Sequence, residues 1–271
     1  MTSNTSRSVI TLEGVHKSFG KQKVLEDVNL TIQEGTTTVI TGPSGAGKSV
    51  ILKHMMGLIR PDKGTVKVFG HDLSRVTRRQ LREIRSSFGV LFQGVALFDS
   101  MTVYDNIALP LRERRVGDKM TAGQIRLNVL EKLSLVGLSG VENKYPSQLS
   151  GGMLKRVGLA RALALNPKII FFDEPTTGLD ASRSNEIYRL FWESQKQFNY
   201  TAVIVSHDFP RIFKLCDYVA LLSERTIVSS VTPEEFQMSD HPAIKSFAEM
   251  TMGPIYMSEK EEAIYHEEDR S

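Results

Sequence analysis

Two continuously apolar runs stand out in the hydrophobic pattern of the second half of the chain. KIIFFDEP at 168–175 and TAVIVSHD at 201–208 each end in acidic or histidine residues. Such runs are typical of parallel strands buried on both faces, with functional groups at their carboxyl ends. The helical pattern ASRSNEIYRLFWESQKQ lies between them and predicts a crossover helix. The pattern therefore predicts an α/β fold around a parallel sheet.

The first ninety residues show shorter β-like runs that alternate with turn signals. These runs are SVITLEGV at 8–15, VNLTI at 28–32, TTTVI at 36–40 and GTVKVFG at 64–70. A helical pattern, KSVILKHMMGLI, opens directly from a glycine-rich loop between the last two. From about 94 to 165 the pattern changes, because no strand run occurs there and apolar residues recur at helical spacing. The apolar residues at that spacing are Ile125, Val129, Leu130 and Leu133, and they predict a helical insertion.

Composition restricts the class of protein. The chain of 271 residues has 34 Lys and Arg against 31 Asp and Glu, and this net charge of +3 gives no argument for nucleic acid as a partner. The single cysteine, Cys216, excludes a disulfide within the chain. No apolar window is long enough to span a bilayer, and the N-terminus lacks the apolar segment of a secretory signal. We expect a soluble, cytoplasmic protein, which leaves open docking onto a partner that is not soluble.

A phosphate-binding loop is the strongest motif. GPSGAGKS at 42–49 matches G-x-x-x-x-G-K-[ST], and it lies between a predicted strand and a predicted helix, the context that this motif requires. Lys48 would pair the β- and γ-phosphates of a nucleoside triphosphate, and Ser49 would ligate Mg²⁺. The expected nucleotide contacts in this loop are Gly42, Pro43, Ser44, Gly45, Ala46, Gly47, Lys48, Ser49 and Val50.

The strand ends supply the acids and the histidine that phosphate chemistry needs. Asp173 would hold Mg²⁺, and Glu174 would polarise the attacking water as a general base. His207 follows the other apolar run, at the same sheet edge, and we expect it to reach the γ-phosphate or the water. Gln93 comes directly after the strand-like FGVLF at 88–92, where it can meet Mg²⁺ or the water.

In this order the motifs resemble the ATP-binding subunit of an ABC transporter, from about Val9 to Val228. GPSGAGKS stands as the Walker A loop, LSGGM at 149–153 as the signature, IIFFD with Glu174 as Walker B and base, and TGLD at 177–180 as the D-loop. The resemblance implies Q-loop and switch roles for Gln93 and His207, a nucleotide contact for Asp180, and stacking of Phe19 on adenine. It also implies ATP and Mg²⁺ as ligands.

The resemblance further implies a P-loop NTPase core with a parallel sheet, an N-terminal antiparallel β subdomain and an α-helical subdomain. We place the ATPase domain at 1–231, with its helical subdomain at about 94–165, and a C-terminal extension at 232–271. In this family two subunits pack head to tail, so that Ser150, Gly151 and Gly152 of one close over the nucleotide of the other. The expected assembly is a homodimer bound to a multi-spanning permease. Met153 stands where the signature usually has Gln. This difference puts in doubt the polar coupling between this helix start and the rest of the subunit.

The branch of the family is indicated by FQGVALFDSMTVYDNIALPLRE at 92–113, together with LSGGM. These segments look most like the ATPase of Mla/MCE systems, which implies phospholipid transport, an MCE-type lipid-binding partner and a peripheral position on the cytoplasmic face of the inner membrane. The alternative is the ATPase of an importer of amino acids or osmolytes. A soluble, non-transport ABC ATPase is a third reading, disfavoured because this chain has one nucleotide domain and a short insertion. We expect no nucleic acid partner.

Two segments lie outside the motifs. Arginines recur in SRVTRRQLREIR at 74–85 with a spacing that would place them on one face of a helix. We interpret this basic face as a solvated helix surface in preference to a binding site for anionic lipid headgroups. The extension contains Phe247, Ile255, Tyr256 and Tyr265, which are too apolar for a simple solvated tail. We expect the extension to pack on the partner ATPase.

Overall fold

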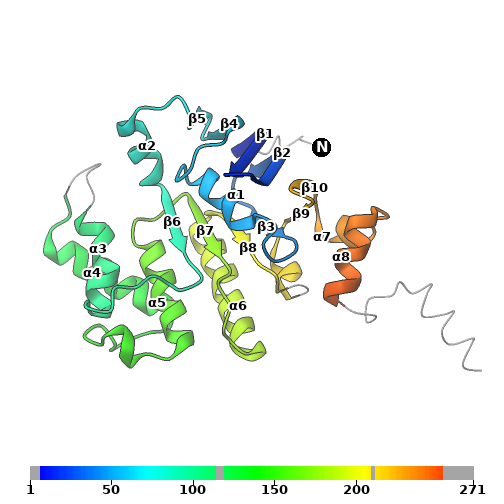
Figure 1. The fold of residues 1–271 in the computed structure, drawn as a ribbon. Helices are drawn as coiled ribbons and strands as arrows, with labels where there is room; N and C mark the ends of the chain where they lie inside the picture. The colour runs from blue at the N-terminus through cyan, green and yellow to red at the C-terminus, as the bar shows by residue number, and fades with distance from the viewer. Residues whose placement is uncertain (1–6, 114–118, 209–210, 253–271) are drawn as a thin grey trace, which may run out of the picture.

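The computed structural model describes residues 7–113, 119–208 and 211–252, and a six-stranded sheet forms its centre (Figure 1). Its strand order is β10-β9-β3-β8-β7-β6, and all neighbouring pairs are parallel except β9 and β10. The strands are β3 (Thr37–Thr41), β6 (Phe88–Leu91), β7 (Ile169–Asp173), β8 (Thr201–Val205), β9 (Tyr218–Ser223) and β10 (Thr226–Val231). The two apolar runs are therefore adjacent parallel strands, β7 and β8, as predicted.

A second sheet is antiparallel and comes from the N-terminal part of the chain. Its order is β2-β1-β4-β5, and it consists of β1 (Ser8–Phe19), β2 (Gln22–Gln33), β4 (Lys63–Val68) and β5 (His71–Asp72). The first two strands are longer than their apolar runs because they continue as a hairpin to a tight turn at Gly20. This sheet confirms the predicted N-terminal antiparallel β subdomain.

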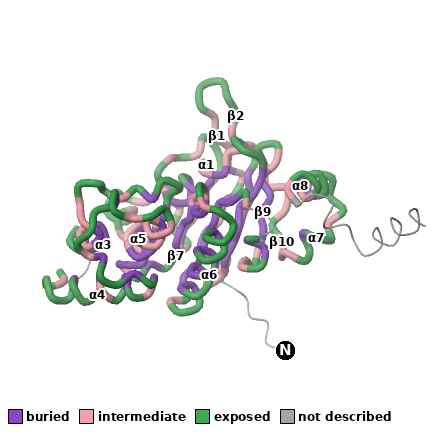
Figure 2. Tube along the Cα trace, turned by 90° about the horizontal axis from the view of Figure 1, so that it is seen from below, coloured by how far each residue is buried: buried purple, intermediate pink, exposed green. Residues whose placement is uncertain are grey.

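Helices cover both faces of the central sheet, and buried residues gather along its strands (Figure 2). On one face, Ile169 and Phe171 of β7 join the cluster formed by α1 and the antiparallel sheet. On the other face, Ile170 and Phe172 join the cluster formed by α3, α4, α5 and α6. The α-helices are α1 (Lys48–Met55), α2 (Arg78–Arg85), α3 (Val103–Arg112), α4 (Ala122–Leu135), α5 (Gly151–Leu163), α6 (Ala181–Phe198), α7 (Pro233–Gln237) and α8 (Pro242–Met252), and short 3₁₀ turns lie at Pro146–Gln148 and Arg211–Leu215.

Segment 94–165 contains α3, α4 and α5, and its described residues include no strand. Ile125, Val129 and Leu133 of α4 are buried, as their spacing predicts, whereas Leu130 is half-buried at the edge of the same face. No helix in the described parts of the chain combines the length and the apolarity that crossing a bilayer requires.

The arginines of 74–85 do not form the single basic face that their spacing predicts. Arg75 precedes α2 and pairs with Asp72 at 3.2 Å. Arg85 turns inward, and its guanidinium donates to the carbonyls of Met56 and Gly57. The prediction from spacing was wrong because the guanidinium of Arg85 hydrogen-bonds to backbone carbonyls at the end of α1 and does not face solvent with the other arginines.

The segment after β10 folds back on the core as α7 and α8. Phe236 and Phe247 are buried in the same cluster as the helical segment. Ile255, Tyr256 and Tyr265 lie outside the described residues, and so does the expected contact of these three residues with a second subunit.

Candidate nucleotide site

The phosphate loop connects the end of β3 to the start of α1. Gly42 has a φ of 144°, and a Cβ at this position would lie 2.1 Å from the carbonyl oxygen of Leu222, so no larger residue fits there. Gly47 precedes α1, and no side chain caps this helix start. The first backbone N–H groups of α1 are therefore available to an anion.

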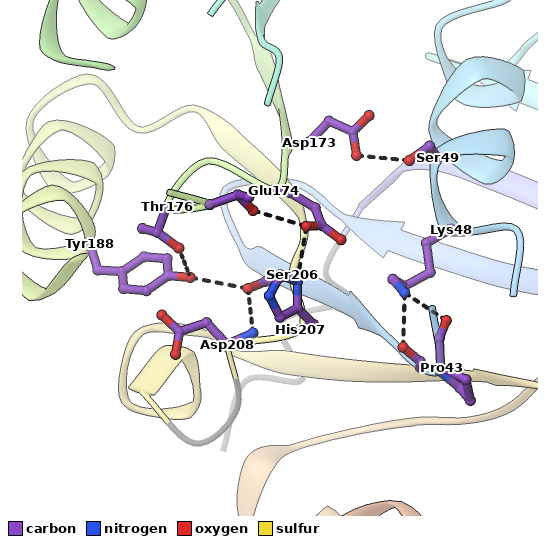
Figure 3. Close-up of polar contacts among 12 residues, drawn as sticks. Pro43, Lys48, Ser49, Asp173, Glu174, Thr176, Tyr188, Ser206, His207 and Asp208 are labelled. Atoms are coloured by element: carbon purple, nitrogen blue, oxygen red, sulfur yellow. Dashed lines mark hydrogen bonds and ion pairs between the residues drawn. The ribbon is translucent and has the colours of Figure 1, made fainter. Parts of the chain in front are cut away.

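Lys48 lies inside this loop (Figure 3). Its ammonium donates hydrogen bonds to the carbonyl oxygens of Gly42 at 2.8 Å and Pro43 at 2.9 Å, and its side chain is buried. Burial lowers the pKa of Lys48, and the carboxylates of Glu174 and Asp173 act in the opposite direction. The ammonium thus lies where loop carbonyls hold it close to two acids.

Ser49 and Asp173 meet across the site, although 124 positions separate them in the chain. The Ser49 hydroxyl donates to Asp173 Oδ1 at 2.9 Å. Burial raises the pKa of Asp173, the hydrogen bond from Ser49 opposes this shift, and the neighbouring Glu174 adds to it. In the described parts of the chain, no group of three or more His, Cys, Asp or Glu side chains could enclose a metal ion. A hydroxyl and one carboxylate instead fit Mg²⁺, which takes few protein ligands and completes its shell with phosphates and water.

Glu174 and His207 form a second pair at the same edge of the sheet. His207 Nδ1 lies 2.9 Å from Glu174 Oε2, and the hydroxyl of Thr177 donates to this same oxygen at 2.9 Å. Oε1 has no hydrogen-bond partner among the described residues. Glu174 has a φ of 47°, an unusual value for a residue other than glycine, and its backbone N–H donates to the carbonyl of Val205. Strain of this kind is often found at functional sites.

Three of the predicted site residues make no hydrogen bond or ion pair with the Ser49–Asp173 or Glu174–His207 pair in the part of the chain that the structure describes. Phe19 ends β1 with about half of its surface exposed, and the Lys17 ammonium lies 5.5 Å from its ring centroid. Gln93 is exposed after β6, and its backbone carbonyl accepts a hydrogen bond from Lys155. Asp180 caps α6 by accepting a hydrogen bond from the backbone N–H of Arg183 at 2.9 Å.

The signature residues form the start of α5. Ser150 is the N-cap, and its hydroxyl oxygen accepts a hydrogen bond from the backbone N–H of Met153 at 3.3 Å. Gly151 is exposed, and Gly152 is half-buried. No hydrogen bond or ion pair within the described ranges joins 150–152 to the phosphate loop. The chain therefore presents two separate helix starts, one after the phosphate loop and one at the signature.

Several polar residues around the site were missed by the sequence analysis. Thr177 was recognised only as part of a loop, whereas Thr176, Tyr188 and Ser206 form a buried hydroxyl network beside Glu174. A tyrosine on the buried face of a helix carries no sequence signal beyond that of a core residue. Lys155 also reads from the sequence as a surface cation, yet it is buried.

The comparisons with known proteins agree with this geometry. The family model for ABC transporters matches residues 25–177. A probable ribonucleotide transport ATP-binding protein, mkl of Mycobacterium bovis, is 45% identical over 261 residues, which cover 96% of this chain and 72% of the relative. The intermembrane phospholipid transport system ATP-binding protein MlaF of Haemophilus influenzae is 35% identical, covering 89% of this chain and 90% of the relative.

Solved structures show the same fold. The ATP-binding cassette MJ0796, determined as a post-hydrolysis dimer bound to ADP and Pi, has a TM-score of 0.74 and 32% identity, covering 83% of this chain and 98% of that one. The cbiO1 protein of Clostridium perfringens, part of the transporter complex cbiONQ, has a TM-score of 0.77 and 26% identity, covering 92% and 97%. These matches confirm the predicted fold class. The chain belongs to the ABC transporter family and is an ATP-binding, ATP-hydrolysing subunit of a transporter.

Proposed function

We propose that this subunit drives the transport of phospholipid, or of a similar hydrophobic molecule, between membranes of the cell envelope. The MlaF proteins, which are named for intermembrane phospholipid transport, support this cargo because they align with the chain over about nine-tenths of their own length. The convergence of the Ser49–Asp173 and Glu174–His207 pairs beside the phosphate loop supports the ATPase chemistry.

The proposed reaction is the attack of water on the γ-phosphate of ATP, which yields ADP and phosphate. Lys48 and the backbone N–H groups of the loop bind the β- and γ-phosphates. Ser49 and Asp173 would hold Mg²⁺, which neutralises phosphate charge when bound. Gln93 would contact the ion or the water, and Phe19 would stack on adenine.

Glu174 is the proposed general base. Its Oε2 is held by Thr177 and His207, so its Oε1 is the atom left to accept the proton of the attacking water. His207 then has two proposed tasks, which are to orient the carboxylate and to meet the γ-phosphate. The reaction depends on this arrangement because a base must lie within hydrogen-bond reach of the proton that it removes.

The functional unit is a proposed head-to-tail homodimer. Ser150, Gly151 and Gly152 of one copy would close over the nucleotide in the other, and Asp180 would lie near the shared site. The separation of the two helix starts within one chain supports this arrangement, and so does the dimeric state of MJ0796. ATP binding would close the dimer, and hydrolysis would release it.

Replacement of Glu174 by Gln tests the base directly. The amide keeps the size of the carboxylate but cannot accept the proton, so we expect ATP turnover to fall by about 100-fold or more while ATP binding persists. Turnover by the full chain and nucleotide binding are measured under the same conditions. Near-normal turnover of Glu174→Gln would refute the assignment.

The cargo requires a separate experiment. The mkl relatives are named for ribonucleotide transport and are more identical to this chain, so ribonucleotides are the second candidate cargo. The tagged subunit would be isolated from gently solubilised native membranes, and its partners and bound lipids would be identified by mass spectrometry. A multi-spanning permease with an MCE-type protein and bound phospholipid would support the proposal, including a peripheral position on the cytoplasmic face of the inner membrane. A permease with a solute-binding protein and no lipid would refute it.

A further inference from the structure

A buried network of hydroxyl groups lies next to the carboxylate and the imidazole of the site (Figure 3). Thr176 Oγ1 lies 2.9 Å from Tyr188 Oη, which lies 3.1 Å from Ser206 Oγ. Ser206 Oγ also accepts a hydrogen bond from the backbone N–H of Asp208 at 3.0 Å. The exposed fractions of Thr176, Tyr188 and Ser206 are only 7%, 2% and 2%. The network is therefore shielded from water. In such an interior, hydrogen bonds are stronger and constrain geometry more than they do in water.

The network joins the loops that follow β7 and β8, which are also linked by the hydrogen bond from the backbone N–H of Glu174 to the carbonyl of Val205. Residue pairing between β7 and β8 ends at Asp173 and Val205, immediately before the loops that carry the base and the histidine. Thr176 lies two residues after Glu174, and Ser206 directly precedes His207. Beyond the last sheet pair, a phenol from α6 thus connects both loops.

His207 depends on such support because its side chain is largely exposed, at 63%. The position of its imidazole is set mainly by the backbone of residues 206–208. Ser206 and the N–H of Asp208 within that stretch are both held by the network. A shift of this backbone would therefore lengthen the 2.9 Å contact from His207 Nδ1 to Glu174 Oε2.

The hydroxyl of Tyr188 is separable from the packing of its ring. The ring lies edge-on to Phe191, with centroids 6.3 Å apart, within the apolar face of α6. Burial raises the pKa of Tyr188 to about 12, so the phenol is neutral at physiological pH and can both donate and accept a hydrogen bond. Phenylalanine would fill the same space and remove only the link.

We propose that Tyr188 is a positioning residue for ATP hydrolysis, whose phenol joins Thr176 to Ser206 and thereby places His207 against Glu174. This inference rests on the roles proposed above for Glu174 and His207. The phenol is buried, and its hydrogen-bond partners are Thr176 and Ser206, so we expect its loss to slow the chemical step and to leave ATP affinity nearly unchanged.

The test compares two tyrosine-to-phenylalanine variants of the full chain. Tyr188→Phe should lower kcat about tenfold, within the range that small displacements of catalytic groups produce, and should change KM for ATP by less than about twofold. Tyr200→Phe is the matched control, because its phenol is equally buried and contacts Ser194 Oγ at 2.8 Å and the carbonyl of Phe191 at 3.1 Å. It lies before β8, at the end away from the site, and should lower Tm comparably without lowering kcat.

A double variant separates positioning through His207 from a general loosening of the fold. If Tyr188 acts through the histidine, His207→Ala with Tyr188→Phe should be no slower than His207→Ala alone. Ser206→Ala breaks the link from the other side and should reproduce the loss of kcat, which provides a test should Tyr188→Phe fold poorly.

Three results would overturn the inference: normal kcat in both Tyr188→Phe and Ser206→Ala, equal loss of kcat in Tyr200→Phe, or multiplicative losses in the double variant. The proposed function is read out separately. Normal turnover of His207→Ala would refute the role of the histidine and this inference together, whereas a slow His207→Ala with a normal Tyr188→Phe refutes only the inference.

Discussion

At the scale of single residues, burial sets the electrostatics of the nucleotide site. Burial raises the pKa of Asp173 and lowers that of Lys48, because both charged forms lose hydration. The hydrogen bond from Ser49 offsets part of the cost at Asp173. A divalent cation bound by this carboxylate would offset more of that cost. Without the ion, the charged carboxylate lowers the stability of the fold, and this loss accompanies the ability to bind the ion.

Replacement of Asp173 by Asn should therefore stabilise the protein without ligands. Because the folded-state pKa lies above the ordinary value of 3.8, the ionised carboxylate costs stability, and the cost builds as pH rises above 3.8 and then stays constant. We expect Tm to rise by about 2–4 °C at pH 7.5, the equivalent of about 1 kcal/mol in a domain of this size. The gain should shrink as pH approaches 3.8 in thermal unfolding measurements.

Asp180→Asn serves as the control for this effect. A hydrogen bond from the backbone of Arg183 lowers the pKa of Asp180, so this carboxylate should give no gain on neutralisation. A lower Tm for Asp173→Asn at pH 7.5 would contradict the account.

At the scale of elements, the helix that begins with the signature is anchored to the segment that carries Gln93. Lys155 donates to the carbonyl oxygen of Gln93 at 2.5 Å, and Arg161 donates to those of Val95 at 2.7 Å and Ala96 at 2.6 Å. Both cations come from α5; Lys155 is buried and Arg161 is half-buried, and burial lowers the pKa of each. These bonds supply a polar connection from α5 that does not involve Met153, the position that departs from the family signature.

Lys155→Met tests this anchor because methionine keeps the apolar stem and removes the donor. Loss of a hydrogen bond from a charged group costs about 1.5–3 kcal/mol, so local opening of residues 93–97 should become about tenfold or more frequent. Hydrogen–deuterium exchange of the full chain measures this opening. Lys132→Met is the control, since Lys132 is equally buried but pairs with Glu131 on α4. Equal acceleration in both variants would refute a specific anchor.

At the scale of the whole molecule, the two helix starts proposed to bind phosphate lie in different parts of one chain. α1 follows strand β3 of the central sheet, whereas α5 belongs to the helical segment at 94–165 (Figure 1). One copy therefore supplies the phosphate loop of one site and the signature of another, if two copies meet head to tail as proposed. Each complete site would then contain residues of both copies.

Mixing two inactive variants tests this arrangement. Lys48→Ala removes the phosphate-loop cation and Ser150→Arg blocks the signature, so each variant alone should have little ATPase activity. In a mixed dimer both defects fall in one site and the other site is intact. With random pairing of independent sites, we expect roughly a quarter of normal turnover from two shared sites. No recovery on mixing, with dimers of both variants verified, would argue against shared sites.

The sequence by itself determined the contiguous parts of this protein: the phosphate loop, the buried parallel strands and the helix starts. These follow from near neighbours in the chain, since strand, glycine loop and helix adjoin in one short stretch. The motifs also predicted that Ser49, Asp173 and His207 serve one site, but only the tertiary structure decided which of these distant groups contact one another directly. Ser49 reaches Asp173, and Glu174 reaches His207, because β3, β8 and β7 lie in this order side by side in the sheet.

Tertiary packing also decided the orientation of side chains whose local pattern was ambiguous. Arg85 turned inward to satisfy backbone carbonyls, and Tyr188 turned its phenol toward two loops, although both residues read from the sequence as ordinary members of a helix. The physical reason is that a helical period specifies a face, whereas the partners on that face come from elements far away in the chain.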